Sequence, residues 1–271
     1  MIPLLITFPH SGESVPAEAP WLDKLDEITL MRDVDRYVDR LYHPIVEKLE
    51  LSHVVTQWHR YAVDLNRTPK DIHPGLVQGA PEGSVDKKFA SGLHWEQTTH
   101  GEVLMDGPMS MENHLLLVDR YYRPFHEQVK AQLAELKELG DGVVYHIDAH
   151  SMPSLGTEKH PDPGEQRAEI VISDCNGASC SSEFKDLVIE QFKKQGFQVA
   201  YNWPYVGGRI TEMYGHPELG QHTLQIEINR KIYMSEETKQ PLSEKFDEVQ
   251  NRICRAVEAV HAGLSQVMSD D

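Results

Sequence analysis

Two histidines and a glutamate stand at or near the ends of three apolar runs, and these residue types can hold a metal ion and hydrolyse an amide. His10 ends the first apolar run, His150 follows the run 143–147, and Glu227 lies within the run 223–228. Neutral imidazole is a good zinc ligand, and two histidines with one carboxylate leave a position open for water. Because ligands bind at the strand ends of α/β sheets, the pattern predicts a hydrolytic metal site there.

The segment around His150 contains three polar groups at alternate positions, so His146, Asp148 and His150 share one face of a predicted strand. Only His150 lies clearly beyond the apolar run, and it is the predicted ligand. Asp148 is predicted to assist catalysis by orienting that ligand or placing charge beside it. His146 is interpreted either as a core residue or in the same supporting role. His10 has the alternative of a loop histidine bonded to backbone.

Three carboxylates compete to complete the metal site. Glu13 follows His10 by three residues but sits in a glycine-containing loop, whereas Asp33 and Asp35 fall within a predicted helix at about 28–49. At about 100° per residue, Asp35 lies inside the apolar stripe of that helix and Asp33 lies about 80° outside it. An ionised carboxylate facing a core is costly unless it is paired or coordinated, which favours Asp35 as the ligand. A structural or capping aspartate is the alternative.

Glu227 interrupts an apolar strand pattern, and it is interpreted as a general base near the metal or as an ion-pair partner. Arginines stand at turn-rich places of a chain with only 26 lysines and arginines against 43 acidic residues. Arginine suits bidentate recognition of carboxylates, although salt bridges are the alternative for at least two of these residues. The predicted substrate clamp draws on Arg60, Arg67, Arg209 and Arg230.

The elements that must position these groups alternate between strands and helices. Strands are predicted at 2–8, 53–56, 61–65, 143–147, 168–173, 198–201 and 223–228. Helices are predicted at 28–49, 111–139, 182–195 and 242–263. The alternation favours one α/β domain over residues 1–271, with a mixed or parallel sheet flanked by helices. A long loop excursion at about 69–110 is expected over the site.

Composition narrows the function classes. The net charge of −17 argues against a nucleic-acid partner and against binding to an anionic membrane. No segment approaches the roughly 20 apolar residues of a membrane span. Three cysteines are too few for a disulfide scaffold in 271 residues, so a reduced, cytoplasmic protein is expected.

At this point the motifs match a family, and the chain resembles the N-formylglutamate amidohydrolases. The matching segments occur in family order over almost the whole chain, and they are PHSGESVP at 9–16, RDVDRYVDRLY at 32–42, RYAVDLNR at 60–67, HIDAHSMPS at 146–154, DCNGASC at 174–180 and NWPYVGGRITEMYGHPELGQHTLQIEINRKIYM at 202–234. Residues 92–114 differ from the corresponding stretch of the histidine-degrading enzymes.

The resemblance implies a fold similar to zinc exopeptidases and N-acetylmuramoyl amidases. It implies one divalent metal, expected to be Zn²⁺, held by His10, His150 and a first-helix carboxylate, with Glu227 as base. Asn202 and Tyr205, from the last matching segment, join the predicted substrate-binding set. The expected reaction converts N-formyl-L-glutamate, or a related small N-acyl amino acid, to formate and L-glutamate. The alternatives are an amidase for another N-acyl amino acid or a peptidoglycan-type amide, and a non-catalytic carboxylate-binding protein.

Overall fold

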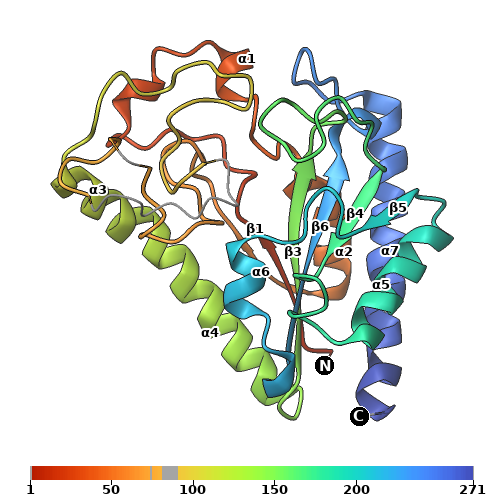
Figure 1. Ribbon diagram of the computed structural model, residues 1–271. Coiled ribbons are helices and arrows are strands. Elements are labelled where there is room, and N and C mark those ends of the chain that lie inside the picture. Colours follow the sequence, from red (N-terminus) through yellow and green to blue (C-terminus); the bar gives the residue numbers. More distant parts are fainter. Residues whose placement is uncertain (1, 74, 81–90, 271) are drawn as a thin grey trace.

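A six-stranded mixed sheet forms the centre of the molecule (Figure 1). The computed structural model describes residues 2–73, 75–80 and 91–270. Its strands are β1 (Leu4–Phe8), β2 (Ser52–Val55), β3 (Val144–Met152), β4 (Ile170–Ser173), β5 (Val199–Tyr201) and β6 (Gln221–Asn229). Their order is β2-β1-β3-β6-β4-β5, and all neighbours are parallel except β4 and β6, which are antiparallel.

Helices cover both faces of this sheet, as Figure 1 shows. One face carries α2 (Val38–Leu49), α5 (Ser182–Lys194) and α7 (Ser243–Asp270). The other face carries α3 (Met111–Leu117), a π-helical turn at Val118–Tyr122, α4 (Arg123–Leu139) and α6 (Arg209–Tyr214). The remaining helical turns are α1 (Glu27–Leu30), Pro20–Leu22, Pro217–Leu219 and Arg230–Ile232. The predicted α/β domain with a helix-flanked mixed sheet is therefore confirmed.

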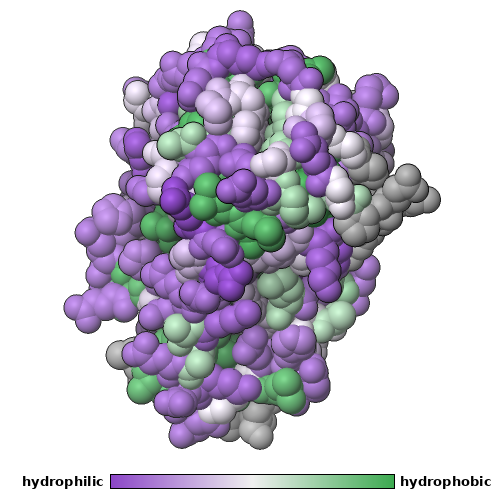
Figure 2. All heavy atoms as spheres, turned by 90° about the vertical axis from the view of Figure 1, so that its left-hand side faces the viewer, coloured by the Kyte–Doolittle hydropathy of each residue, from purple (hydrophilic) through white to green (hydrophobic). Residues whose placement is uncertain are grey.

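Strand alternation divides the apolar core into two clusters. Leu4 and Ile6 of β1 pack with α2, α5 and α7, while Leu5 between them packs with α4 and the loops above it. The central strand β3 is buried at all nine positions, so its polar residues His146, Asp148, His150 and Ser151 lie inside the protein and need partners there. Figure 2 shows the side formed by α3, α4 and the neighbouring loops, where hydrophilic side chains predominate.

Three element predictions are wrong in detail. The predicted strand 61–65 is a series of turns, because its backbone bonds to the excursion through Asp64 N–Leu93 O and Trp95 N–Tyr61 O. The predicted helix 28–49 is interrupted, and residues 31–37 between α1 and α2 are not helical. The strand predicted to end at residue 147 continues as β3 to Met152.

Between Pro69 and Pro108 the described residues, 69–73, 75–80 and 91–108, form turns and isolated bridges without a helix or strand. Residues 74 and 81–90 of the predicted excursion lie outside the described part of the chain. Across residues 2–73, 75–80 and 91–270, no helix combines the length and apolar character needed to span a membrane.

Candidate active site

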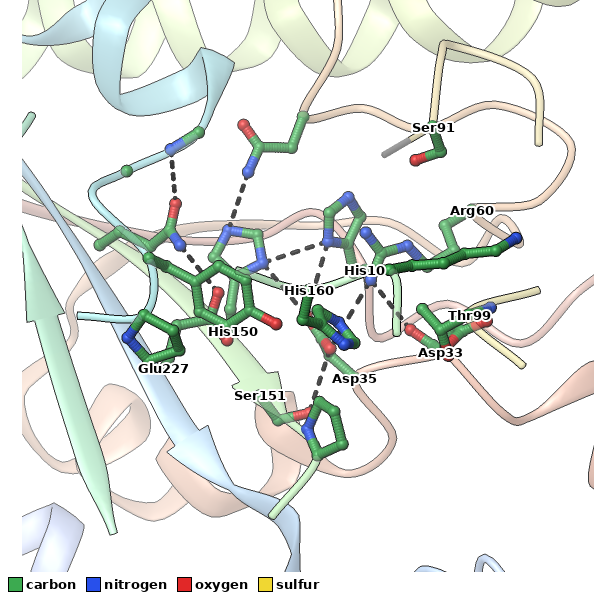
Figure 3. A pocket seen from close by; sticks show the side chains of 18 of the residues that line it. His10, Asp33, Asp35, Arg60, Ser91, Thr99, His150, Ser151, His160 and Glu227 are labelled. Atoms are coloured by element: carbon green, nitrogen blue, oxygen red, sulfur yellow. Dashed lines mark hydrogen bonds and ion pairs between the residues drawn. The ribbon is translucent and has the colours of Figure 1, made fainter. Parts of the chain in front are cut away.

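Three buried ligand-type side chains meet at the carboxyl ends of the central strands (Figure 3). His10 Nδ1 and His150 Nδ1 lie 3.1 Å apart, and Asp35 Oδ2 lies 3.1 Å from His150 Nδ1 and 3.5 Å from His10 Nδ1. Two imidazole nitrogens and a carboxylate oxygen are a donor set that Zn²⁺ accepts, and three protein ligands leave a fourth position open. The predicted ligand atoms therefore converge in an arrangement that could hold a metal ion.

Each histidine is held through its other ring nitrogen by a buried carboxylate. His10 Nε2 lies 2.7 Å from Asp64 Oδ1, and His150 Nε2 lies 2.7 Å from Asp148 Oδ2. With the Nε2 protons donated to these carboxylates, both Nδ1 lone pairs point at the shared centre, as in carboxylate–histidine–metal sites. Burial by itself lowers the pKa of His150, but Asp148 and Asp35 outweigh it and raise that pKa well above its usual value.

Asp35 presents one carboxylate oxygen to the histidines and anchors the other. Its Oδ1 accepts hydrogen bonds from Arg230 Nη2 at 3.0 Å and from Ser151 Oγ at 3.1 Å. Burial opposes ionisation, but the adjacent His10 and His150 side chains, together with the charge of Arg60, keep the pKa of Asp35 well below its usual value. The side chain is therefore a carboxylate with Oδ2 available to a cation.

The helical reasoning that selected Asp35 is wrong, because the residue precedes α2 rather than lying on it. Its backbone N–H donates to His10 O at 2.9 Å, which ties the two segments together. The competing carboxylates have other partners. Asp33 accepts from Tyr61 Oη at 2.7 Å and from Thr99, and Glu13 pairs with Arg36 Nε at 2.8 Å.

Glu227 reaches the same cavity from β6, where it is the register partner of His150 on β3. Its Oε1 accepts from Gln225 Nε2 at 2.8 Å, and Gln225 Oε1 in turn accepts from Gly208 N at 2.8 Å. Glu227 Oε2 is buried and has no hydrogen-bond partner within the described part of the chain. Burial raises the pKa of Glu227 to about 7, although His150 opposes the rise. Such a carboxyl group is suited to exchange a proton near neutral pH.

A cavity of about 260 Å³ opens onto these groups. Four of the predicted substrate-binding residues line it, namely Arg60, Arg67, Tyr205 and Arg230. Two others are not among the lining residues: Arg209 forms ion pairs with Asp71 and Glu212, and Asn202 donates to Asp174.

Several site residues were missed from the sequence. Asp64 was hidden in a segment mistaken for a strand, although its position within an apolar run is the same signal that pointed to Glu227. Trp95 and Thr99 line the cavity from the excursion, and Lys159 and His160 line it from the loop after β3. These four carry no local pattern that separates them from other loop residues.

Known proteins resemble this chain over most of its length. A family model described as N-formylglutamate amidohydrolase matches residues 2–234. An N-formylglutamate deformylase of Pseudomonas aeruginosa is 31% identical over 245 residues, which are 87% of this chain and 84% of that protein. Its namesake from Pseudomonas putida is 30% identical over 243 residues, with coverage of 87% and 83%.

A solved structure has the same fold. The crystal structure of an N-formylglutamate amidohydrolase from Ralstonia eutropha JMP134 superposes with a TM-score of 0.87 at 26% identity, covering 98% of this chain and 94% of that one. Both the sequence match and the superposition extend across the segments that carry the cluster, Glu227 and the cavity. The chain belongs to the N-formylglutamate amidohydrolase family.

Proposed function

We propose that this protein, with the help of one divalent metal, Zn²⁺, hydrolyses N-formyl-L-glutamate to formate and L-glutamate, or a related small N-acyl amino acid to its acyl acid and amino acid. Family membership supports the substrate class. The observation that carries the chemistry is the convergence of His10, Asp35 and His150 beside a buried glutamate with an unpartnered oxygen. The three free thiols fit a reducing compartment, and we propose a cytoplasmic enzyme.

The proposed metal ligands are His10 Nδ1, His150 Nδ1 and Asp35 Oδ2. A divalent ion bound there would polarise the amide carbonyl and lower the pKa of water to about 7. Asp64 and Asp148 keep the two imidazoles in the tautomer whose Nδ1 is a lone-pair donor. Arg230 and Ser151 hold the Asp35 carboxylate so that one oxygen faces the histidines.

Glu227 is the proposed general base. Its unpartnered Oε2 accepts a proton from the attacking water, and the carboxyl group then donates that proton to the departing amine nitrogen. Gln225 holds Oε1 and leaves Oε2 for this exchange. The C–N bond breaks as the nitrogen gains the proton, so the base returns to its carboxylate form.

Positive side chains in the cavity suit a substrate with free carboxylates. Arg60 and Arg67 line the cavity, and we propose that they attract the carboxylates of the amino-acid part together with Tyr205. The donors of Arg230 are occupied by Ser151, Asp35 and backbone carbonyls, so its proposed role is to position Asp35. Arg209 is proposed to hold Asp71 rather than substrate.

The test is the release of formate from N-formyl-L-glutamate by purified protein of measured metal content. We expect turnover with about one metal per chain, its loss after chelation and its return on adding Zn²⁺. Full activity in the chelated protein would contradict the metal proposal. Binding of the substrate without turnover would instead identify a carboxylate-binding protein.

A substrate panel separates glutamate from other amino-acid parts. Hydrogen bonds to charged groups contribute about 1.5–3 kcal/mol each, so replacing a substrate carboxylate by an amide should lower kcat/KM about ten- to a hundredfold. N-formyl-L-glutamine and N-acetyl-L-glutamate are suitable comparisons. Equal rates for the acid and the amide would contradict recognition of the side-chain carboxylate.

A further inference from the structure

The loop that follows β3 brings a histidine into the active-site cavity. His160 lies on this loop and lines the cavity together with His10, Asp35 and His150 (Figure 3). The backbone N–H of Thr157 donates to His160 Nδ1 at 2.9 Å, so Nδ1 must be the lone-pair nitrogen of the ring. The hydrogen of the neutral ring therefore resides on Nε2, and no hydrogen bond between described residues uses it.

The surrounding loop is held by buried contacts, which fixes the direction of this donor. Arg167 forms two hydrogen bonds of 2.7 Å with Asp162, two residues after His160. Gly156 approaches the same segment so closely that an added Cβ would lie 1.9 Å from Asp162 O. The backbone of His160 itself donates to Thr157 O at 2.9 Å. A donor on such a loop is organised before the substrate arrives.

The other cationic side chains in the cavity each donate to protein acceptors, although Nε of Arg60 is buried without a hydrogen-bond partner among the described residues. Arg60 donates to Asp33 O at 2.9 Å and to Asp64 at 3.0 Å. Arg67 donates to Ser91 O at 2.8 Å, and Lys159 Nζ donates to Thr98 O at 3.0 Å. The unpartnered Nε of Arg60 is fully buried, whereas the ring Nε2–H of His160 has a fixed direction, no partner among the described residues and a place in the cavity wall.

Resting on the proposed amide hydrolysis, we propose that His160 is a catalytic residue that donates a hydrogen bond from Nε2 to the carbonyl oxygen of the scissile amide. As water attacks, the carbonyl carbon becomes tetrahedral and its oxygen gains negative charge, which this donor stabilises. No proton is transferred to the oxygen. Burial, assisted by the charge of Arg167, lowers the pKa of His160 to about 4, so the ring stays neutral in the working range.

Tyr205 is the competing donor. It lines the same cavity, and its Oη accepts a hydrogen bond from Arg167 Nη1 at 3.0 Å, which leaves the hydroxyl hydrogen for another acceptor. A hydroxyl hydrogen rotates about its C–O bond, whereas the N–H of a fixed ring does not. We therefore assign the carbonyl contact to His160 and the carboxylate contact to Tyr205.

The test compares His160→Leu, His160→Gln and Tyr205→Phe in metal-loaded protein. The leucine variant removes the donor, while the glutamine amide nitrogen reaches about as far as the original Nε2. For each variant, kcat, KM and metal content are measured with N-formyl-L-glutamate between pH 6 and 9. A ¹⁵N spectrum of the unmodified protein reports which nitrogen of His160 carries hydrogen.

Loss of one oxyanion donor typically lowers kcat about 10²–10³-fold, and we expect this for His160→Leu with about one metal per chain and little change in KM. His160→Gln should recover at least tenfold of the lost kcat, and the loss should be the same at every pH because a neutral donor does not titrate there. Tyr205→Phe should change mainly KM.

Three results would overturn the assignment: near-normal kcat in His160→Leu, no recovery in His160→Gln, or the kcat loss appearing in Tyr205→Phe instead. A spectrum with hydrogen on Nδ1 would do the same. Absence of turnover by the unmodified protein would refute the proposed function rather than the role of His160, so the two failures are distinguishable.

Discussion

Glu227 is the side chain through which the proposed reaction moves a proton. Glu227→Gln keeps the shape of the group but cannot accept a proton, so kcat should fall about 10²–10⁴-fold while the metal stays bound. The matched control is Glu244→Gln at the start of α7, which should leave kcat unchanged. Near-normal turnover by Glu227→Gln would contradict the role as general base and would favour the alternative that Glu227 is an ion-pair partner.

The pH profile of the same pair of proteins tests the state of the base. Only the carboxylate form accepts a proton, and burial raises the pKa of Glu227 to about 7. Activity should therefore fall as the pH decreases through this pKa, by about tenfold per unit below it. A bound cation favours the carboxylate and moves this limb to lower pH. The residual activity of Glu227→Gln should not fall at acidic pH in this way. If the fall persists in that variant, the titrating group is a residue other than Glu227.

Asp35 is expected to dominate metal affinity among the acidic residues near the cluster. Asp35→Asn replaces the charged ligand oxygen and leaves Arg230 without its buried partner, so metal content should fall well below one per chain. Asp33→Asn is the control, since its carboxylate faces Tyr61 and Thr99. Equal metal loss in both variants, measured by elemental analysis, would contradict the ligand assignment.

The sequence predicted the polar groups of this site better than it predicted their surroundings. His10, Asp148 and Glu227 could be found because a polar residue within or just after an apolar strand is a local pattern. Asp35 was selected from a helical phase that the backbone does not have. Asp64 and His160 escaped because their contacts with the cluster and the cavity depend on loops that are distant along the chain.

At the scale of elements, the register between β1 and β3 places Thr7 opposite Asp148. Thr7 Oγ1 donates to Asp148 Oδ1 at 2.7 Å and contacts His146 Nε2 at 2.9 Å. Because the hydroxyl hydrogen goes to Asp148, His146 must donate from Nε2, and its Nδ1 is the acceptor for Thr223 Oγ1 at 3.3 Å. The strands thus support the carboxylate that orients His150.

Thr7→Val should weaken metal binding without unfolding the sheet. It removes the hydrogen bond that orients Asp148, and loss of such outer contacts typically costs about 10–100-fold in metal affinity. Thr223→Val, one step further from Asp148, should cost less. Titration against a competing chelator measures both affinities, and a Thr7→Val protein that binds metal as tightly as the unmodified one would contradict this role.

Helices and strands were predictable from the sequence where the spacing of apolar residues matches the secondary structure that the backbone forms. The run 61–65 failed because its buried side chains resemble those of a strand while its backbone pairs with loop residues 93–95. The short helix α6 was missed because six residues give too little periodicity. The antiparallel pairing of β4 with β6 depends on long connections and has no local signal.

At the scale of the whole molecule, a net charge of −17 surrounds a cavity that contains arginines. A dianionic substrate is repelled at long range, and raising the salt concentration from 0.01 to 0.15 M shortens the screening length from about 30 to about 8 Å. Attraction by buried cations is screened less. We therefore expect kcat/KM for N-formyl-L-glutamate to rise over this range, whereas that of a neutral N-formyl amide should change little. A steep fall for the dianion would show that attraction dominates its approach.

Gly208 has a consequence for which sequences this family member can tolerate. A Cβ added at Gly208 would lie 2.2 Å from Asn66 Nδ2. The backbone N–H of Gly208 also donates to Gln225, which in turn donates to Glu227. When random variants are selected for growth on the substrate, we therefore expect every surviving sequence to have glycine at position 208. At Gly107 an added Cβ would meet no atom of the described residues within 4 Å, so the surviving variants should carry many different residues there.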